Sequence, residues 1–234
     1  MCGRYFWNDD AEEAFEDDFP DLADGARKLR TGDYTPAMQA LAVTGAEAAS
    51  AWMKDGAGEV QTAAPNMTAS GGITGTQAEM RHKIRHIAPL AAEILQWGFP
   101  GFEKGRLLIN ARAESVLTRP TFSESFRSRR CVIPAAGFYE WDSKKEKVIF
   151  TLPDKPVLYL AGIFRPYGPE KRFVILTREA NASMLPVHDR MPLILTSEEA
   201  ALWVKDVSEA ESILTKVLPQ LRAERPYEQL TFDW

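Results

Sequence analysis

The second residue of the chain, Cys2, carries the most distinctive chemistry in the sequence. If Met1 is removed, Cys2 presents a free α-amine and a thiol on adjacent carbons. The reference pKa of an α-amine is about 7.7–8.0, so a fraction is neutral and nucleophilic near pH 7. Such an amine condenses with an aldehyde to a Schiff base, and the thiol can then close a thiazolidine ring. A terminal cysteine can equally attack an amide, and Cys2 is incidental if Met1 stays in place.

Polar residues further along the chain could serve the same site. Asn110 and Arg112 stand two positions apart at a predicted strand-to-helix junction, so both side chains could point into one cleft. Asn110 supplies a neutral amide, and Arg112 supplies a fork of donors for phosphate. Glu140 lies in an aromatic strand, either facing solvent or buried where it would suit a general acid. His188 could transfer protons near neutral pH, although many histidines are purely structural.

The sequence predicts neither a metal site nor a cofactor. His82 and His86 have the i, i+4 spacing of a helical metal pair, but no third ligand stands near them. Cys131 lies in an apolar segment, which is typical of a buried thiol. The glycine-rich and histidine motifs of nucleotide-binding proteins and metalloproteases do not occur in the chain.

Composition predicts a soluble globular protein of one domain. The 234 residues are 45% hydrophobic and 26% charged. No apolar run reaches the roughly 18–20 residues of a membrane span, and the first residues do not resemble a secretory signal. Two cysteines are too few for a disulfide framework, so we expect a cytoplasmic protein without membrane contact.

Charge is distributed unevenly along the chain, whose net charge is −5. Residues 1–24 hold nine acidic residues and a single base, whereas residues 81–130 hold ten Lys and Arg against four acids. Salt screens distant acids within about 10 Å at 0.1 M, so the basic segment could bind phosphates locally. A solvated face of arginines is the alternative interpretation.

Hydrophobic patterning predicts an α+β protein with a mainly antiparallel sheet. Short spacings between apolar segments favour hairpins over repeated βαβ units. Residues 44–93 are predicted to contain a loop-rich insertion, because small and polar residues dominate there. Strands are predicted over 39–43, 94–99, 107–110, 131–134, 137–141, 147–152, 157–164 and 172–177. Helices are predicted over 11–19, 111–117, 197–204 and 208–222.

Several motifs together resemble one family over almost the whole chain. They are Met1–Tyr5, Trp97-Gly98, Ile109–Glu114, Arg129–Trp141, Thr177–Asn181 and His188–Pro192. In this order they closely resemble the SRAP family (SOS response-associated peptidase domain proteins), which shield abasic sites in single-stranded DNA. The resemblance implies a single SRAP domain over residues 1–234, with a barrel-like sheet flanked by helices.

The resemblance implies roles for individual residues. Cys2 would capture the aldehyde of the abasic sugar as a thiazolidine, with Asn110 positioning its amine. Glu140 and His188 would manage protons and slow reversal of the adduct. The residues that would contact DNA are Arg4, Trp97, Gly98, Arg112, Arg129, Arg130, Trp141 and Arg190.

The implied partner is single-stranded DNA containing abasic sites, bound by a monomer that joins the nucleoid when on DNA. Two alternatives remain open at this point: a peptidase with an N-terminal nucleophile, acting on itself or on other chains, and a non-covalent binder of single-stranded DNA. Lyase-like activity is a further implication of the resemblance.

Overall fold

The computed structural model describes residues 3–45 and 89–226. Cys2 and most of the insertion predicted at 44–93 therefore lie outside the described residues. The two ends of that range are strand, because β3 (Gln39–Gly45) and β4 (Leu90–Trp97) pair in antiparallel register from Gln39–Gln96 to Gly45–Leu90. The chain on either side of residues 46–88 is thus held in one strand pair.

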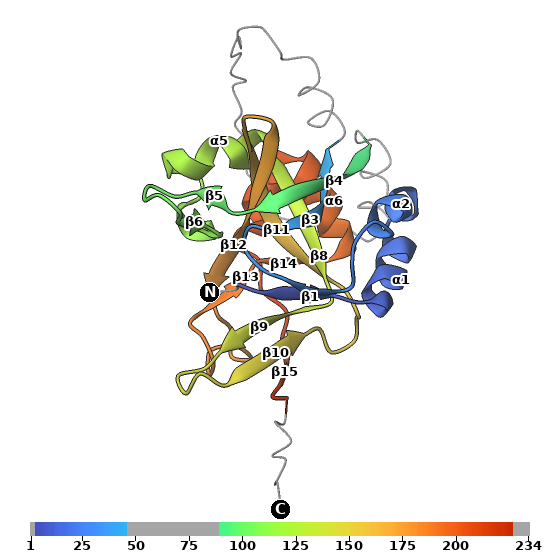
Figure 1. The fold of residues 1–234 in the computed structure, drawn as a ribbon, viewed down its shortest axis with the longest axis vertical. Helices are drawn as coiled ribbons and strands as arrows, with labels where there is room; N and C mark the ends of the chain where they lie inside the picture. Colours follow the sequence, from blue (N-terminus) through green and yellow to red (C-terminus); the bar gives the residue numbers. More distant parts are fainter. Residues whose placement is uncertain (1–2, 46–88, 227–234) are drawn as a thin grey trace, which may run out of the picture.

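Five strands close into a barrel at the centre of the molecule (Figure 1). Their order is β12, β4, β3, β8, β11 and back to β12, and only β12 and β4 pair in parallel. The α+β class with a mainly antiparallel, barrel-like core is therefore confirmed. The other barrel strands are β8 (Arg130–Ala135), β11 (Leu158–Tyr167) and β12 (Glu170–Glu179). Three short strands extend the barrel sheet: β7 (Asn110–Arg112), β13 (Arg190–Pro192) and β14 (Ile194–Leu195).

A second, wholly antiparallel sheet lies against one end of the barrel, at the lower end in Figure 1. Its order is β15-β10-β9-β1-β2, so the first strand of the chain lies inside the sheet. Its strands are β1 (Tyr5–Trp7), β2 (Gly32–Tyr34), β9 (Gly137–Trp141), β10 (Lys147–Thr151) and β15 (Arg222–Glu224). A separate hairpin joins β5 (Phe99–Pro100) and β6 (Leu107–Leu108).

Helices cover the barrel from outside. The acidic helix predicted from Ala11 is α1 (Asp9–Asp18), capped by the Asn8 side chain and ended before Pro20. A capping box between Thr196 and Glu199 begins α6. The helical segments are η1 (Pro20–Leu22), α2 (Ala23–Ala26), η2 (Ala113–Ser115), α5 (Pro120–Ser128), α6 (Ser197–Lys205) and α7 (Val207–Ile213).

The core centres on β8, in which every residue is buried. Cys131 is fully enclosed, and burial raises the pKa of its thiol well above the ordinary value. The indole N–H of Trp203 on α6 donates to the carbonyls of Cys131 and Gly162, at 3.0 and 3.1 Å. These bonds fix α6 on the barrel wall.

Two predicted helices are wrong in part. The helix expected at 111–117 is strand β7 followed by the single turn η2, because β7 pairs with β12. Helix α5 follows instead, with Pro120 in its first turn, and had not been predicted. The helix expected over 208–222 ends at Ile213, and Pro219 interrupts the remainder.

Candidate functional site

Asn110 and Arg112 lie on one side of strand β7. The strand pairs in parallel with β12, which sets Asn110 beside Ile175 and Arg112 beside Thr177. The residue between them, Ala111, points the other way into the core. Asn110 is half-buried and Arg112 is exposed, so this edge presents an amide and a guanidinium together.

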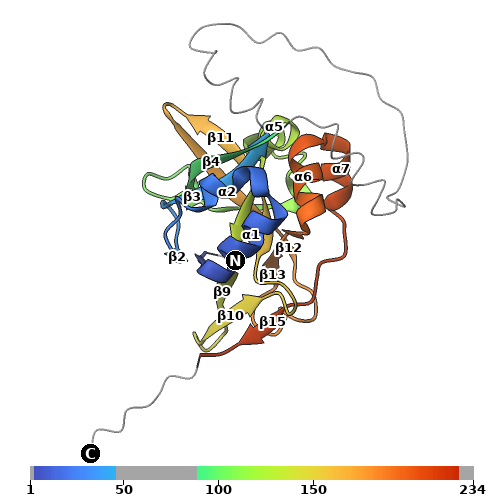
Figure 2. The ribbon, with the colours of Figure 1, turned by 90° about the vertical axis from the view of Figure 1, so that its right-hand side faces the viewer.

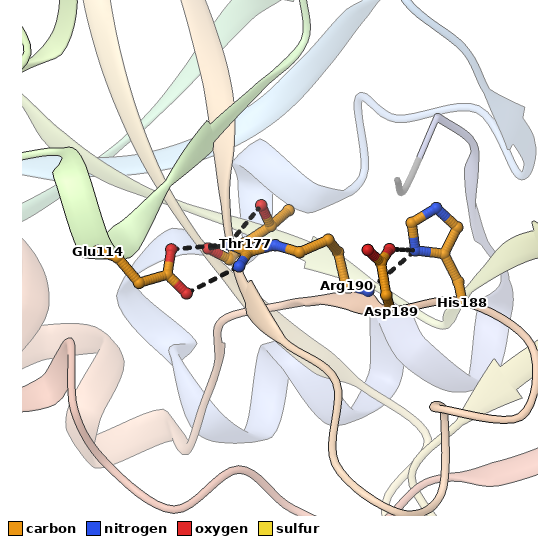
Figure 3. A network of polar contacts seen from close by, with 5 residues as sticks. All are labelled: Glu114, Thr177, His188, Asp189 and Arg190. Atoms are coloured by element: carbon orange, nitrogen blue, oxygen red, sulfur yellow. Dashed lines mark hydrogen bonds and ion pairs between the residues drawn. The ribbon is translucent and has the colours of Figure 1, made fainter.

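Arg190 joins this edge to the loop that carries His188. Its guanidinium donates two bonds of 2.8 Å to the Glu114 carboxylate and a third of 2.6 Å to the Thr177 carbonyl (Figure 3). The Arg190 side chain is only 11% exposed. These bonds hold the pKa of Glu114 below its usual range. Arg190 therefore ties β13 to the turn η2 and to β12, and its contact with DNA stays a prediction.

The His188 imidazole is oriented by its own loop. Nδ1 accepts a hydrogen bond of 2.9 Å from the Arg190 backbone N–H, so a neutral ring carries its proton on Nε2. Asp189 Oδ1 lies 3.0 Å from the same Nδ1. A nitrogen that accepts from the Arg190 N–H has no proton to donate to Asp189. Nε2 is the atom suited to proton exchange.

A second group of residues comes from the other sheet. Glu140 on β9 is only 4% exposed, so it faces the interior and not solvent. Arg4 precedes β1, and its carbonyl accepts a bond of 2.9 Å from the Tyr139 N–H. The Arg4 guanidinium lies 5.5 Å from the ring centre of Trp141, which is 39% exposed. Arg4 and Trp141 thus form a cation–π pair at the surface, one position along β9 from the buried Glu140.

Asp33 holds the Arg4 end of this group. It accepts a bond of 2.8 Å from the Tyr139 hydroxyl and lies 3.7 Å from Arg4 Nη1. Burial and this bond to Asp33 raise the pKa of Tyr139, so the phenol remains a donor. Tyr139 and Asp33 were not predicted to be partners, because they are 106 positions apart in the chain.

The two groups meet where the sheets join. Figures 1 and 2 place the beginning of β1 at the level of β13, with β9 just below both. The two sheets therefore meet near the start of β1, where Arg4 precedes the strand and β9, the strand of Glu140, pairs with it. The candidate site is this junction.

Three of the residues predicted to contact DNA are buried and have structural bonds. Trp97 is fully buried between Tyr5 and Phe173, and its indole N–H donates to the Ile109 carbonyl at 3.0 Å. Gly98 is buried with φ +108°, a conformation that favours glycine. Both residues are buried, and the Trp97 bond fixes the segment that leads into Asn110; their contact with DNA stays a prediction.

Arg130 is the third buried residue among the predicted DNA contacts, and it is only 6% exposed. Its guanidinium donates to the carbonyls of Phe126, Arg127, Trp203 and Val204, at 2.5–3.1 Å. Burial lowers its pKa to about 10. Arg130 therefore closes the end of α5 against α6. Its neighbour Arg129 pairs with Glu124 at 2.9 Å and is 21% exposed.

Sequence reasoning missed Glu114 as a functional partner. Glu114 ends the motif Ile109–Glu114, so its position was noted but its role was not. Among the residues that the structure describes, no group of three or more His, Cys, Asp and Glu could hold a metal ion. No helix within 3–45 or 89–226 is long and apolar enough to cross a membrane.

The family to which this chain belongs follows from a match to a family model. Residues 1–231 match the model of the family described as SOS response associated peptidase (SRAP). The chain belongs to the SRAP family. SRAP relatives include the abasic site processing protein YoaM of Bacillus subtilis, 33% identical over 138 residues, which cover 53% of this chain and 61% of YoaM.

More distant SRAP relatives carry the same description. The abasic site processing protein YedK of Escherichia coli is 32% identical over 117 residues, which cover 47% of this chain and 53% of YedK. HMCES of Xenopus tropicalis is 27% identical over 150 residues, which cover 53% of this chain and 43% of HMCES. The matches therefore span less than two thirds of each relative.

A phage-related protein of Bordetella bronchiseptica shares the fold. Its crystal structure aligns with a TM-score of 0.64 at 23% identity, over 96% of this chain and 94% of the other.

Proposed function

We propose that this protein captures abasic sites in single-stranded DNA covalently through Cys2. The observation that carries the proposal is that β9, which holds the buried Glu140, pairs with β1, the strand that begins three residues after Cys2. The relatives described as abasic site processing proteins support it. The exposed cations Arg4 and Arg112 provide phosphate contacts beside this junction.

The chemistry has two steps. The Cys2 amine attacks the aldehyde carbon of the ring-opened sugar, and loss of one water gives a Schiff base. The Cys2 sulfur then adds to the imine carbon while its proton passes to nitrogen, which closes the thiazolidine. Asn110 orients the amine, and Glu140 and His188 supply and remove protons at the sugar oxygen and the nitrogen.

A denaturing gel with intact and abasic oligonucleotides tests the proposal. Wild type is expected to give a heat-stable conjugate with abasic DNA only, and Cys2→Ala none. Cys2→Ser keeps the amine but lacks the thiol, so its adduct should survive heat only after borohydride reduction. Cys131→Ser is the matched control and should conjugate like wild type. If wild type forms no conjugate after intact-mass measurement has shown loss of Met1, the proposal is wrong.

The same variants separate the two other functions. A peptidase, which the family description suggests, would cleave a peptide without DNA and lose this activity in Cys2→Ala. A non-covalent binder would bind intact DNA in a salt-sensitive manner that survives Cys2→Ala.

A further inference from the structure

A preformed groove adjoins the candidate site on the side of β2. Its volume is about 550 Å³, and it lies between the segment 28–34 and the paired strands β3 and β4. Figure 2 shows α2 and β2 beside β3 and β4 on this side of the molecule. Asp33 on β2 lines the groove and lies 3.7 Å from the Arg4 guanidinium, so the groove adjoins the Arg4 end of the candidate site.

The groove has a net positive wall. Lys28 and Arg30 are exposed, and neither forms an ion pair with a residue that the structure describes. The acid in the lining, Asp33, already serves Arg4 and the Tyr139 hydroxyl. Two cations are therefore available to an anionic ligand that enters from the candidate site.

The opposite wall is apolar and exposed. Met38 is 42% exposed and Ile94 is 44% exposed, and both line the groove. The turn that presents Met38 is held in place: Ala37 has φ +73°, and its carbonyl accepts a bond of 2.9 Å from the Gln96 side chain. A non-glycine residue in this conformation is strained, and such strain is often retained at binding sites. Thioether and alkyl groups suit the face of a nucleobase without selecting one base.

We propose that this groove binds an undamaged nucleotide of the strand that carries the abasic site. Lys28 and Arg30 contact its phosphates, and Met38 and Ile94 contact its base. The inference rests on the proposed function for the choice of a DNA strand as occupant. The groove would thus supply affinity and register while Cys2 performs the chemistry.

Charge reversal tests the cationic wall. Lys28→Glu with Arg30→Glu should weaken binding of an intact single-stranded oligonucleotide about tenfold and reduce the salt slope of log K by about 1.4. At saturating abasic DNA the yield of conjugate should match wild type. Lys155→Glu with Arg222→Glu makes the same change in net charge at exposed positions outside the groove and should bind like wild type. Equal affinity and salt slope in the two double variants would overturn the proposal.

Photocrosslinking tests the apolar wall. A 4-thiothymidine placed next to the abasic site, on one side and then on the other, should attach to a peptide that contains Met38 or Ile94 from one of the two positions. Attachment only to peptides outside the groove would overturn the proposal. If wild type binds DNA without forming a conjugate while the groove variant still loses affinity, the Cys2 chemistry is wrong and the groove assignment stands.

Discussion

Arg112 and Arg130 come from the same basic stretch of sequence but have opposite surroundings. Arg112 stands exposed at the edge of β7, whereas Arg130 is buried and bonded to four backbone carbonyls. Arg190 lies between these extremes, with its charge committed to Glu114. A count of arginines along a chain therefore overstates the charge that DNA can meet, because helix ends and strand junctions use some of them internally.

Loss of Arg130 should have the largest effect on stability. Arg130→Ala leaves buried carbonyls without donors, so the free energy of unfolding should fall by about 4 kcal/mol. Urea unfolding followed by tryptophan fluorescence measures this change. The folded fraction should bind single-stranded DNA as wild type does, and a selective loss of DNA affinity at unchanged stability would contradict the structural role.

Arg112→Ala should show the opposite pattern. Its stability should stay within about 0.5 kcal/mol of wild type, because the side chain is exposed. Its affinity for single-stranded DNA should fall about tenfold, with a salt slope smaller by about 0.7. Titration at several salt concentrations measures both quantities. If Arg112→Ala is less stable than wild type but binds single-stranded DNA with wild-type affinity, Arg112 has a structural role like that of Arg130.

The Glu114–Arg190 clamp should contribute about 1 kcal/mol, since water partly screens the half-exposed Glu114. Arg190 lowers the pKa of Glu114 in the folded state. The stabilisation is therefore present above the unfolded value of about 4.3 and is lost as the pH falls through the lower folded value. Glu114→Gln should be less stable than wild type at pH 7, and the difference should shrink below about pH 4. A difference independent of pH would show that the carboxylate charge is not involved.

Arg129→Gln should have the smallest effect on stability, about 0.5 kcal/mol or less, because its partner Glu124 is exposed. Urea unfolding in low and high salt measures it, and salt should remove the difference. A larger loss would place Arg129 with Arg130 as a structural residue.

Local patterns were sufficient for much of the fold. Closely spaced apolar segments with turns between them predicted β9, β10 and most of β12, and a short acidic segment closed by Pro20 predicted α1. Leu214, Leu218 and Leu221 have the spacing of the buried face of a helix, and all three are buried. Pro219 nevertheless prevents a helix in this segment. The strand predicted over 107–110 ends too early, because pairing with β12, more than sixty positions away, carries β7 on to Arg112.

The candidate site was less predictable than the fold. Motif resemblance selected Asn110, Glu140 and His188. The structure puts Asn110 on β7 beside β12, Glu140 in the interior and His188 in the loop before β13, and their shared role stays a prediction. The same resemblance marked Trp97 and Trp141 alike, yet one is buried and the other is exposed. Burial depends on which strands enclose a residue, and a single strand does not reveal that.

Enclosure of Cys131 in β8 gives the chain a useful property for labelling. The chain has two cysteines, and Cys131 is fully buried with a raised thiol pKa. It should stay silent toward iodoacetamide until the barrel opens. Alkylation of the native protein would therefore report on the Cys2 thiol alone. The fraction of Cys2 that has reacted with DNA could be measured as the loss of this labelling, with Cys131 left in place.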